Sequence, residues 1–395
     1  MTSNYPEITL KKGREAALLR GHPWVFSGAV AAVCGKPAAG DIVVARDATG
    51  RPVALGFFNP RTDIAFRVLT RNTTEAITPD FWRRRLRTAC TMRRKIINSR
   101  TNAYRLINAE GDGFPGLIVD AYNTALVVSV TTAGMEAQKQ CITDALISLL
   151  NPALIYEQSR GRSRDLEGLE SKNGFLLGND QSGLVEIEEN GFKFKVDFVT
   201  GQKTGFFLDQ RINREKIGAL SCNARVLNCF AYTGAFSVYC VAGGAQRVVS
   251  LDISTPACAA IRENMKSNGY DVETHPVVET DVFTYLRNTP EKFDLIILDP
   301  PAFAKAKRDV VKASRGYKEI NMQAFKRLPP GGILATFSCS NFIEEELFYK
   351  IVRGAAGDAG ANPQLLARLE AGPDHPILLG HPEGRYLKGL LLTVS

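Results

Sequence analysis

The chain has 395 residues, of which 45% are hydrophobic and 23% charged, and its formal net charge is +8. This length allows two or three domains with separate cores, and the composition is that of a globular protein without low-complexity tracts. No apolar run reaches the roughly 18 residues of a membrane-spanning helix, and the N-terminal segment lacks the apolar stretch of a secretory signal. We therefore expect a cytoplasmic protein with no membrane partner.

The cysteines and histidines predict neither disulfides nor a metal site. The eight cysteines are scattered without a C-x-x-C pair, which in a cytosolic chain indicates thiols. The four histidines do not cluster with cysteines at zinc-ligand spacing.

The positive charge is concentrated at the N-terminal end. Residues 1–100 contain 18 Lys and Arg against 7 Asp and Glu, and seven of these cations fall within residues 83–95, a predicted helix. We find no acid interleaved among them to form i,i+4 pairs. This favours a polyanionic partner, most simply nucleic acid, over a solvated helix face.

The first half of the chain predicts two small regions. Residues 5–72 show short strands separated by glycine turns, typical of a small β-barrel or sandwich. These strands are predicted at 25–26, 41–45, 52–58 and 64–69. Residues 73–190 mix the basic helix with strands at 117–120 and 125–130 and a helix near 134–150, and a hairpin follows at 186–199. This is an α+β pattern.

From about residue 200 onward, apolar strands alternate with helices, which predicts a doubly wound α/β domain with a parallel sheet. The strands are predicted at 225–228, 247–251, 293–298 and 333–337. The helices are predicted near 211–220, 234–242, 255–268, 318–327 and 343–354. We expect domain boundaries that give 1–73, 74–190 and 191–395.

Acids at the carboxyl ends of these strands suggest a nucleoside cofactor. The turn after the first strand, 228–236, has one glycine and lacks the G-x-G-x-x-G that cradles a dinucleotide pyrophosphate. Asp252 ends the second strand, where a carboxylate suits a ribose diol, and Asp281 follows the third, where it could accept from an adenine amine. Each acid alone is more often a strand-end cap. Together they favour S-adenosylmethionine (SAM) over NAD.

The fourth and fifth strands end in the sharpest motifs. Asp299-Pro300-Pro301 follows the fourth strand, and the prolines fix the backbone so that Asp299 is held at the sheet edge. Cys339 follows the fifth strand, and its flanking serines suggest a polar strand exit. Because adjacent parallel strands end at the same edge, we expect both side chains in one crevice, with Cys339 as a nucleophile.

These motifs resemble a known family. Asp299-Pro300-Pro301 followed by Ser338-Cys339-Ser340 is similar to the pyrimidine-C5 methyltransferases. The stretch TGFFLDQR at 204–211 resembles a motif of the bacterial PUA-domain-containing 23S ribosomal RNA cytosine-C5 methyltransferases. The resemblance covers essentially the whole chain. It implies a PUA-like RNA-binding domain at 1–73, an α+β linking domain at 74–190 and a class I (Rossmann-like) SAM methyltransferase domain at 191–395.

The resemblance also implies a function and a set of site residues. SAM is the expected methyl donor and a cytosine of 23S rRNA, naked or in an assembling subunit, the acceptor; a homodimer is left open. Cys339 is the expected nucleophile toward C6, and Asp299 is the second catalytic residue. The expected cofactor contacts are Asp209, Arg211, Asn228, Phe230, Tyr232, Thr233, Gly234, Asp252, Asp281 and Asp299. The expected RNA contacts are Arg83, Arg84, Arg87, Arg93, Lys305, Lys307 and Tyr317.

Three alternatives stay open from the sequence. Asp-Pro-Pro also suits methylation of an exocyclic amine of guanine or adenine, which needs no nucleophile. Uracil C5 methylation shares the thiol and differs only in the acceptor. A non-enzymatic RNA-binding or assembly protein could keep a relic of the catalytic domain.

Overall fold

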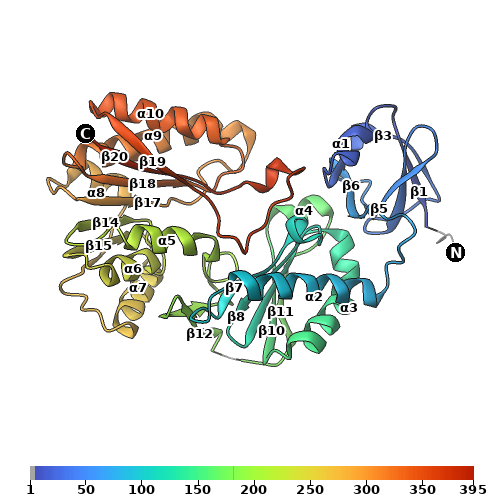
Figure 1. The fold of residues 1–395 in the computed structure, drawn as a ribbon, viewed down its shortest axis with the longest axis horizontal. Coiled ribbons are helices and arrows are strands. Elements are labelled where there is room, and N and C mark those ends of the chain that lie inside the picture. Colours follow the sequence, from blue (N-terminus) through green and yellow to red (C-terminus); the bar gives the residue numbers. More distant parts are fainter. Residues whose placement is uncertain (1–4, 181) are drawn as a thin grey trace. The chain divides into compact units, whose positions relative to one another are not determined.

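The computed structural model describes residues 5–180 and 182–395, which divide into two compact units (Figure 1). The first unit comprises Met1–Asn190, Val196–Phe206 and Pro373–Gly384. The second comprises Gly191–Lys195, Phe207–Gly372 and Arg385–Ser395. The chain therefore passes between the units several times, and the expected division into three consecutive domains stays a prediction.

The first unit begins with a six-stranded sheet in the order β2-β6-β5-β4-β1-β3. Its strands are β1 (Glu7–Leu10), β2 (Trp24–Phe26), β3 (Val30–Cys34), β4 (Ile42–Arg46), β5 (Pro52–Phe58) and β6 (Ile64–Thr70), and the short helix α1 (Glu15–Leu19) follows β1. The four predicted strands are present. The sequence prediction missed β1 and β3, and β3 is mostly exposed, so it lacks the apolar alternation that marks a half-buried strand.

A second sheet of the first unit has the order β11-β10-β9-β8-β7. Its strands are β7 (Ala103–Asn108), β8 (Leu117–Tyr122), β9 (Ala125–Val130), β10 (Leu154–Ser159) and β11 (Lys172–Leu177). The helices are α2 (Pro79–Ile96), α3 (Ala133–Leu150) and α4 (Arg162–Glu167). Helix α2 packs on this sheet through Phe81, Trp82 and Leu86, which are buried in one core with strand residues. The hairpin of β12 (Leu184–Glu189) and β13 (Phe192–Asp197) follows, as predicted.

The second unit contains a seven-stranded sheet in the order β16-β15-β14-β17-β18-β20-β19. Its strands are β14 (Arg225–Cys229), β15 (Arg247–Asp252), β16 (Val277–Glu279), β17 (Leu295–Leu298), β18 (Ile333–Ser338), β19 (Pro363–Leu369) and β20 (Lys388–Val394). Strands β14 to β18 are parallel, whereas β20 runs antiparallel to β18 and β19. The doubly wound α/β fold is confirmed, and the antiparallel pair β19–β20 adds an edge that the sequence analysis did not predict.

Helices cover both faces of this sheet, which explains why its central strands are continuous apolar runs. They are α5 (Arg211–Gly218), α6 (Ala235–Ala242), α7 (Thr255–Ser267), α8 (Val282–Asn288), α9 (Val310–Arg327) and α10 (Glu345–Ala359). Side chains of α8, α9 and α10 share one core with the sheet, and side chains of α5 and α6 share another. The order of strands reverses at β14, so the crevice beyond its carboxyl end is the expected ligand position of such a sheet.

Within the described ranges, we find no helix long and apolar enough to span a membrane.

Candidate active site

The loop between β14 and α6 has an unusual backbone. Phe230 and Tyr232 have φ angles of 58° and 49°, and Gly234 has a φ of 78°. Left-handed conformations of bulky residues are strained and persist only where surrounding contacts hold them. Here Ala231 N donates to Leu251 O at 2.9 Å and Gly234 N donates to Ala231 O at 2.8 Å. The contacts hold a tight loop at the carboxyl end of the central strand.

Asp252 lies beside this loop at the end of β15. Its Oδ2 accepts a hydrogen bond from Tyr232 N at 2.9 Å, and its Oδ1 accepts one from Ser254 N at 2.9 Å. Each carboxylate oxygen can accept more than one hydrogen bond. The partly exposed carboxylate is thus fixed in orientation while it keeps acceptor capacity for a ribose diol.

Two other expected cofactor contacts have structural roles here. Asp281 is the N-cap of α8, and its Oδ1 accepts from both the backbone N and the hydroxyl of Thr284 at 2.9 Å. Asn228 is buried, and its Nδ2 donates to Ser237 Oγ at 2.9 Å, away from the loop backbone. The Asn228 amide nitrogen is thus used inside the unit, and a contact of this residue with the cofactor stays a prediction.

Asp299 follows β17 and contacts a residue that the sequence analysis did not select. Gln210 Nε2 donates to Asp299 Oδ2 at 3.0 Å, and Asn213 Nδ2 donates to Gln210 Oε1 at 2.7 Å. Gln210 stands inside the stretch 204–211 that carried the resemblance, and Asn213 follows three residues later on the same helical face. This spacing was the signal that could have identified the pair.

The flanking residues Asp209 and Arg211 are buried at the start of α5. Asp209 Oδ2 accepts a hydrogen bond from the hydroxyl of Tyr386, and Gly372 N donates to Asp209 O at 3.0 Å. Both partners belong to the second unit. Asp209 thus binds the segments next to β19 and β20. A direct contact with the cofactor stays a prediction for Asp209 and for Arg211.

Cys339 follows β18 and lies between two buried serines. Its Sγ is 3.9 Å from Pro300 O, so the ends of β17 and β18 meet as expected. Ser338 Oγ donates to Tyr317 OH at 3.1 Å, and Ser340 Oγ lies 3.3 Å from the same hydroxyl. The serines are 0% and 1% exposed. The expectation of a polar strand exit was therefore wrong: the serines are internal braces, and only the thiol between them is partly exposed.

Tyr317 is itself fully buried on α9, with its ring 4.6 Å from that of Phe303. Burial raises the pKa of its phenol, which its hydrogen bonds with Ser338 and Ser340 partly offset. The neutral hydroxyl stays a hydrogen-bonding group at physiological pH. The structure removes Tyr317 from the expected RNA contacts, because its ring is packed under the Cys339 loop.

Two fully buried cysteines of this unit, Cys229 and Cys240, are unsuited to chemistry. Burial raises the pKa of Cys240 to about 12 and that of Cys229 still higher. A thiol without access to its thiolate form is inert as a nucleophile. Cys339, partly exposed at a strand end beside Asp299, has a different setting.

The expected cationic contacts divide into exposed and buried groups. Arg83, Arg84 and Arg87 are exposed on α2, and Lys305 and Lys307 are exposed in the loop after β17. Arg84 pairs with Glu75 at 2.9 Å and with Asp80, four residues before it, at 3.4 Å. No acid lies within residues 83–95, as the sequence analysis states, but Asp80 just before them forms an i,i+4 pair that it did not consider.

Arg93 is 1% exposed and binds Asp112 through both terminal nitrogens, at 2.9 and 2.5 Å. Its charge is used inside the protein, since the guanidinium also donates to Arg105 O at 2.8 Å. The structure removes Arg93 from the expected RNA contacts.

The fold and this strand-end site define a class I methyltransferase, and the comparisons with known proteins agree. The profile of the S-adenosylmethionine-dependent methyltransferase family matches residues 105–391, and that of a PUA-like domain matches residues 8–71. The chain has the fold of SMU.776, described as a methyltransferase and solved in complex with SAH. The TM-score is 0.85 and the identity 22%, with 98% of this chain and 100% of that chain covered.

Full-length relatives give the family. The chain is 45% identical over 389 residues to the ribosomal RNA large subunit methyltransferase I of Aeromonas salmonicida, covering 98% of both chains. It is 41% identical over 396 residues to the enzyme of the same name from Klebsiella pneumoniae, covering 99% of both. The chain belongs to the family of the ribosomal RNA large subunit methyltransferases I. It is a SAM-dependent methyltransferase.

The donor groups of the site fit this cofactor. Two backbone amides orient the carboxylate of Asp252 at the end of β15. The tight loop that contains Gly234 lies beside it and lacks the glycine motif that binds phosphates. A carboxylate for a diol and no phosphate cradle suit a nucleoside without phosphates, which SAM is.

Proposed function

We propose that this enzyme methylates C5 of a cytosine in 23S rRNA through a covalent bond between Cys339 and C6 of the base. The relatives' name supports large-subunit rRNA as the substrate. The observation that carries the finer proposal is the junction of β17 and β18. There Cys339 Sγ lies 3.9 Å from Pro300 O, one residue from Asp299.

C5 of cytosine is too weak a nucleophile to take a methyl group by itself, so methylation at C5 needs an enzyme nucleophile that activates the ring. Attack of the Cys339 thiolate forms an S–C6 bond and moves electron density to C5. Bound SAM supplies the methyl group, on a sulfonium centre. C5 would bond to that methyl carbon as the donor's S–CH3 bond breaks and leaves its electron pair on the sulfur of SAH. Solvent water then takes the C5 proton, the C5–H electron pair forms the C5=C6 double bond, and the S–C6 bond breaks with its electron pair returning to Cys339.

Asp299 is suited to stabilise the attacked ring. Thiolate addition places negative charge on N3 and O2 of the base, and an acid that shares a proton with N3 stabilises that charge. The hydrogen bond from Gln210 and the two following prolines hold the carboxyl group in one orientation. Gln210 is thus proposed as a positioning residue for Asp299.

The exposed cations are proposed to bind the RNA backbone. Arg87 on α2 and Lys305 and Lys307 after β17 are exposed to phosphates, and so are Arg83 and Arg84, which also pair with Asp80. The base must leave any stack to reach a thiol in a strand-end crevice, so single-stranded or flipped RNA is the expected substrate.

The decisive experiment uses RNA in which the target cytosine is replaced by 5-fluorocytosine. The fluorine at C5 cannot leave as a proton does, so the enzyme should remain covalently attached through Cys339, as a band stable to denaturing electrophoresis. Cys339→Ser should abolish both the adduct and methyl transfer, whereas Cys222→Ser, at an exposed cysteine, should change neither.

The outcomes separate the alternatives. Methyl transfer that survives Cys339→Ser would support an exocyclic amine acceptor and overturn the proposal. An adduct formed with 5-fluorouracil RNA but not with 5-fluorocytosine RNA would assign uracil instead. Bisulfite mapping of rRNA from a strain that lacks the protein then locates the modified cytosine.

A further inference from the structure

Lys388 is a buried lysine with no role in the sequence analysis. It is 8% exposed at the start of β20, and its Cα pairs with that of Ser338 in the antiparallel ladder between β18 and β20. Residues paired across a ladder project from the same face of the sheet. Lys388 therefore lies opposite Ser338, the last residue of β18 and the one before Cys339.

The ammonium group of Lys388 contacts the loop that carries the thiol. Its Nζ donates a hydrogen bond of 2.7 Å to Ser340 O, the carbonyl just after Cys339. With Tyr317 OH beside the hydroxyls of Ser338 and Ser340, this bond holds the residues on both sides of Cys339. A buried lysine is costly unless its charge is used.

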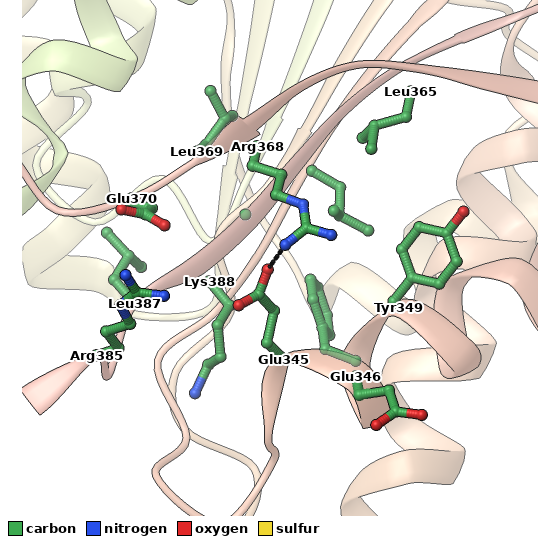
Figure 2. A pocket seen from close by; sticks show the side chains of 13 residues that line it. Glu345, Glu346, Tyr349, Leu365, Arg368, Leu369, Glu370, Arg385, Leu387 and Lys388 are labelled. Atoms are coloured by element: carbon green, nitrogen blue, oxygen red, sulfur yellow. Dashed lines mark hydrogen bonds and ion pairs between the residues drawn. The ribbon is translucent and has the colours of Figure 1, made fainter. Parts of the chain in front are cut away.

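The charged groups around Lys388 are mostly acidic, and one of them is shared with another cation. The negative charges of Glu344 and Glu345 at the start of α10 act on its ammonium. Figure 2 shows Glu345 bound to Arg368 of β19 in a pocket of about 440 Å³. Lys388 lines this pocket, and Glu346, Glu370 and Arg385 complete the charged groups of its wall. The carboxylate of Glu345 therefore neutralises Lys388 only in part.

We propose that Lys388 is a positioning residue whose ammonium holds the Cys339 loop and stabilises the thiolate form of Cys339. This inference rests on the proposed function, because a stabilised thiolate matters where Cys339 attacks the base. It adds to the mechanism a cation that is held against the Cys339 loop, through Ser340 O, before SAM or RNA binds.

The electrostatics agree with the geometry. Burial lowers the pKa of Lys388, while the negative charges of Cys339, Glu345 and Glu344 raise it in part. Interactions between charges are mutual, so an ammonium that is stabilised by the thiolate stabilises the thiolate equally. Loss of this ammonium should therefore raise the pKa of Cys339. A pKa higher by about one lowers the thiolate fraction about tenfold at any pH below that pKa.

The test measures the thiol itself, without RNA. The rate of alkylation of Cys339 by iodoacetamide is followed against pH in the full-length protein, with the Cys339 peptide quantified by mass spectrometry. In Lys388→Met we expect the midpoint to rise by about one pH unit, so that alkylation near neutral pH slows by about tenfold. Lys388→Arg should keep most of the wild-type profile. Lys350→Met is the control: it removes an exposed lysine that pairs with Glu346, and the alkylation profile of Cys339 should stay unchanged.

A second variant should shift the alkylation midpoint of Cys339 in the opposite direction. Glu345→Gln removes a carboxylate that competes for Lys388, so the alkylation midpoint should fall. If Lys388→Met does not fold, the midpoint of Glu345→Gln and the profile of Lys388→Arg still test the inference. Unchanged midpoints in folded Lys388→Met or in Glu345→Gln would overturn the inference.

Methyl transfer provides an independent readout. In Lys388→Met the rate should fall near neutral pH and recover as the pH rises, because hydroxide restores the thiolate. A loss of rate equal at every pH would assign Lys388 a purely structural role. Failure of the 5-fluorocytosine adduct test would overturn the nucleophile and leave the alkylation result standing, so the two failures are distinguishable.

Discussion

Two backbone amide groups orient the carboxylate of Asp252, for which a contact with the ribose of the cofactor is a prediction. The amides come from Tyr232 in the loop after β14 and from Ser254 at the start of α7. Asp281 has the same strand-end position, yet its carboxylate accepts hydrogen bonds from Thr284 of its own helix. Two aspartates at equivalent strand ends thus differ in their local contacts: backbone amides from two elements orient one carboxylate, and the other caps its own helix.

Asp252→Ala is therefore expected to weaken SAM binding. Hydrogen bonds to a charged group contribute about 1.5–3 kcal/mol, so the dissociation constant measured by titration calorimetry should rise roughly ten- to hundredfold. Asp271→Ala is a matched control, since Asp271 also accepts backbone hydrogen bonds, from Glu273 and Thr274, in an exposed turn. Equal affinities in the two variants would contradict the assignment of Asp252.

The loop between β14 and α6 illustrates how one glycine permits a close contact between elements. Gly234 has a φ of 78°, and an added Cβ would lie 2.8 Å from Cγ2 of Ile261 on α7. The loop can approach α7 only without a side chain at this position. Its left-handed neighbours Phe230 and Tyr232 are then held by the bonds to Asp252 and to the end of β15.

Gly234→Ala should lower the free energy of unfolding more than Gly269→Ala does. Both glycines have a φ of 78°, but nothing lies within 4 Å of a Cβ added at Gly269. The left-handed conformation alone costs about 1–2 kcal/mol, and overpacking against Ile261 should add about 1–3 kcal/mol. Urea unfolding of the two variants measures the difference. Equal decreases in the free energy of unfolding would show that the Ile261 side chain can move aside without destabilising the fold.

The elements with strong apolar periodicity were predictable from the sequence, and so were the positions of Asp252, Asp299 and Cys339 at strand ends. Strands β19 and β20 were missed, and β19, which forms the edge of the sheet, is mostly exposed and lacks the apolar alternation of a half-buried strand. The fate of individual polar side chains was also beyond prediction. Arg93 and Arg87 lie on the same basic helix, and only tertiary packing decides that Arg93 is buried.

Gln210 and Lys388 were missed for a related reason. Gln210 lacks a titratable group, and Lys388 stands in a segment whose role depends on its pairing with β18. Sequence spacing predicted the positions of Asp299 and Cys339, whereas Gln210 and Lys388, which we propose to orient them, became visible only through their contacts.

The first unit is held together by charges as well as by its apolar cores. Arg93 joins α2 to β7 through Arg105 O, to the turn at Asp112, and to the C-terminal segment through Asp374 O at 3.1 Å. The side chain of Asp112 is only 9% exposed. Removing one partner of a buried ion pair leaves the other charge uncompensated.

Arg93→Ala should destabilise the first unit by about 3–5 kcal/mol, measured by chemical denaturation. Arg87→Ala, on the exposed side of the same helix, should change stability by less than about 0.5 kcal/mol. It should instead weaken RNA binding and reduce the salt dependence of log K by about 0.7–0.9 if one phosphate contact is lost. A stable Arg93→Ala variant with weakened RNA binding would reverse these assignments.

The return of residues 373–384 to the first unit has a consequence for biosynthesis. Arg105 N donates to Asp374 Oδ2 at 3.0 Å, so this unit is completed by a segment close to the end of the chain. A ribosome adding about 5–20 residues per second needs roughly 10–35 s to travel from residue 206 to residue 384. The unit that emerges first is therefore finished last, and nascent chains stalled before residue 373 should be cleaved by protease faster in this unit than released chains are.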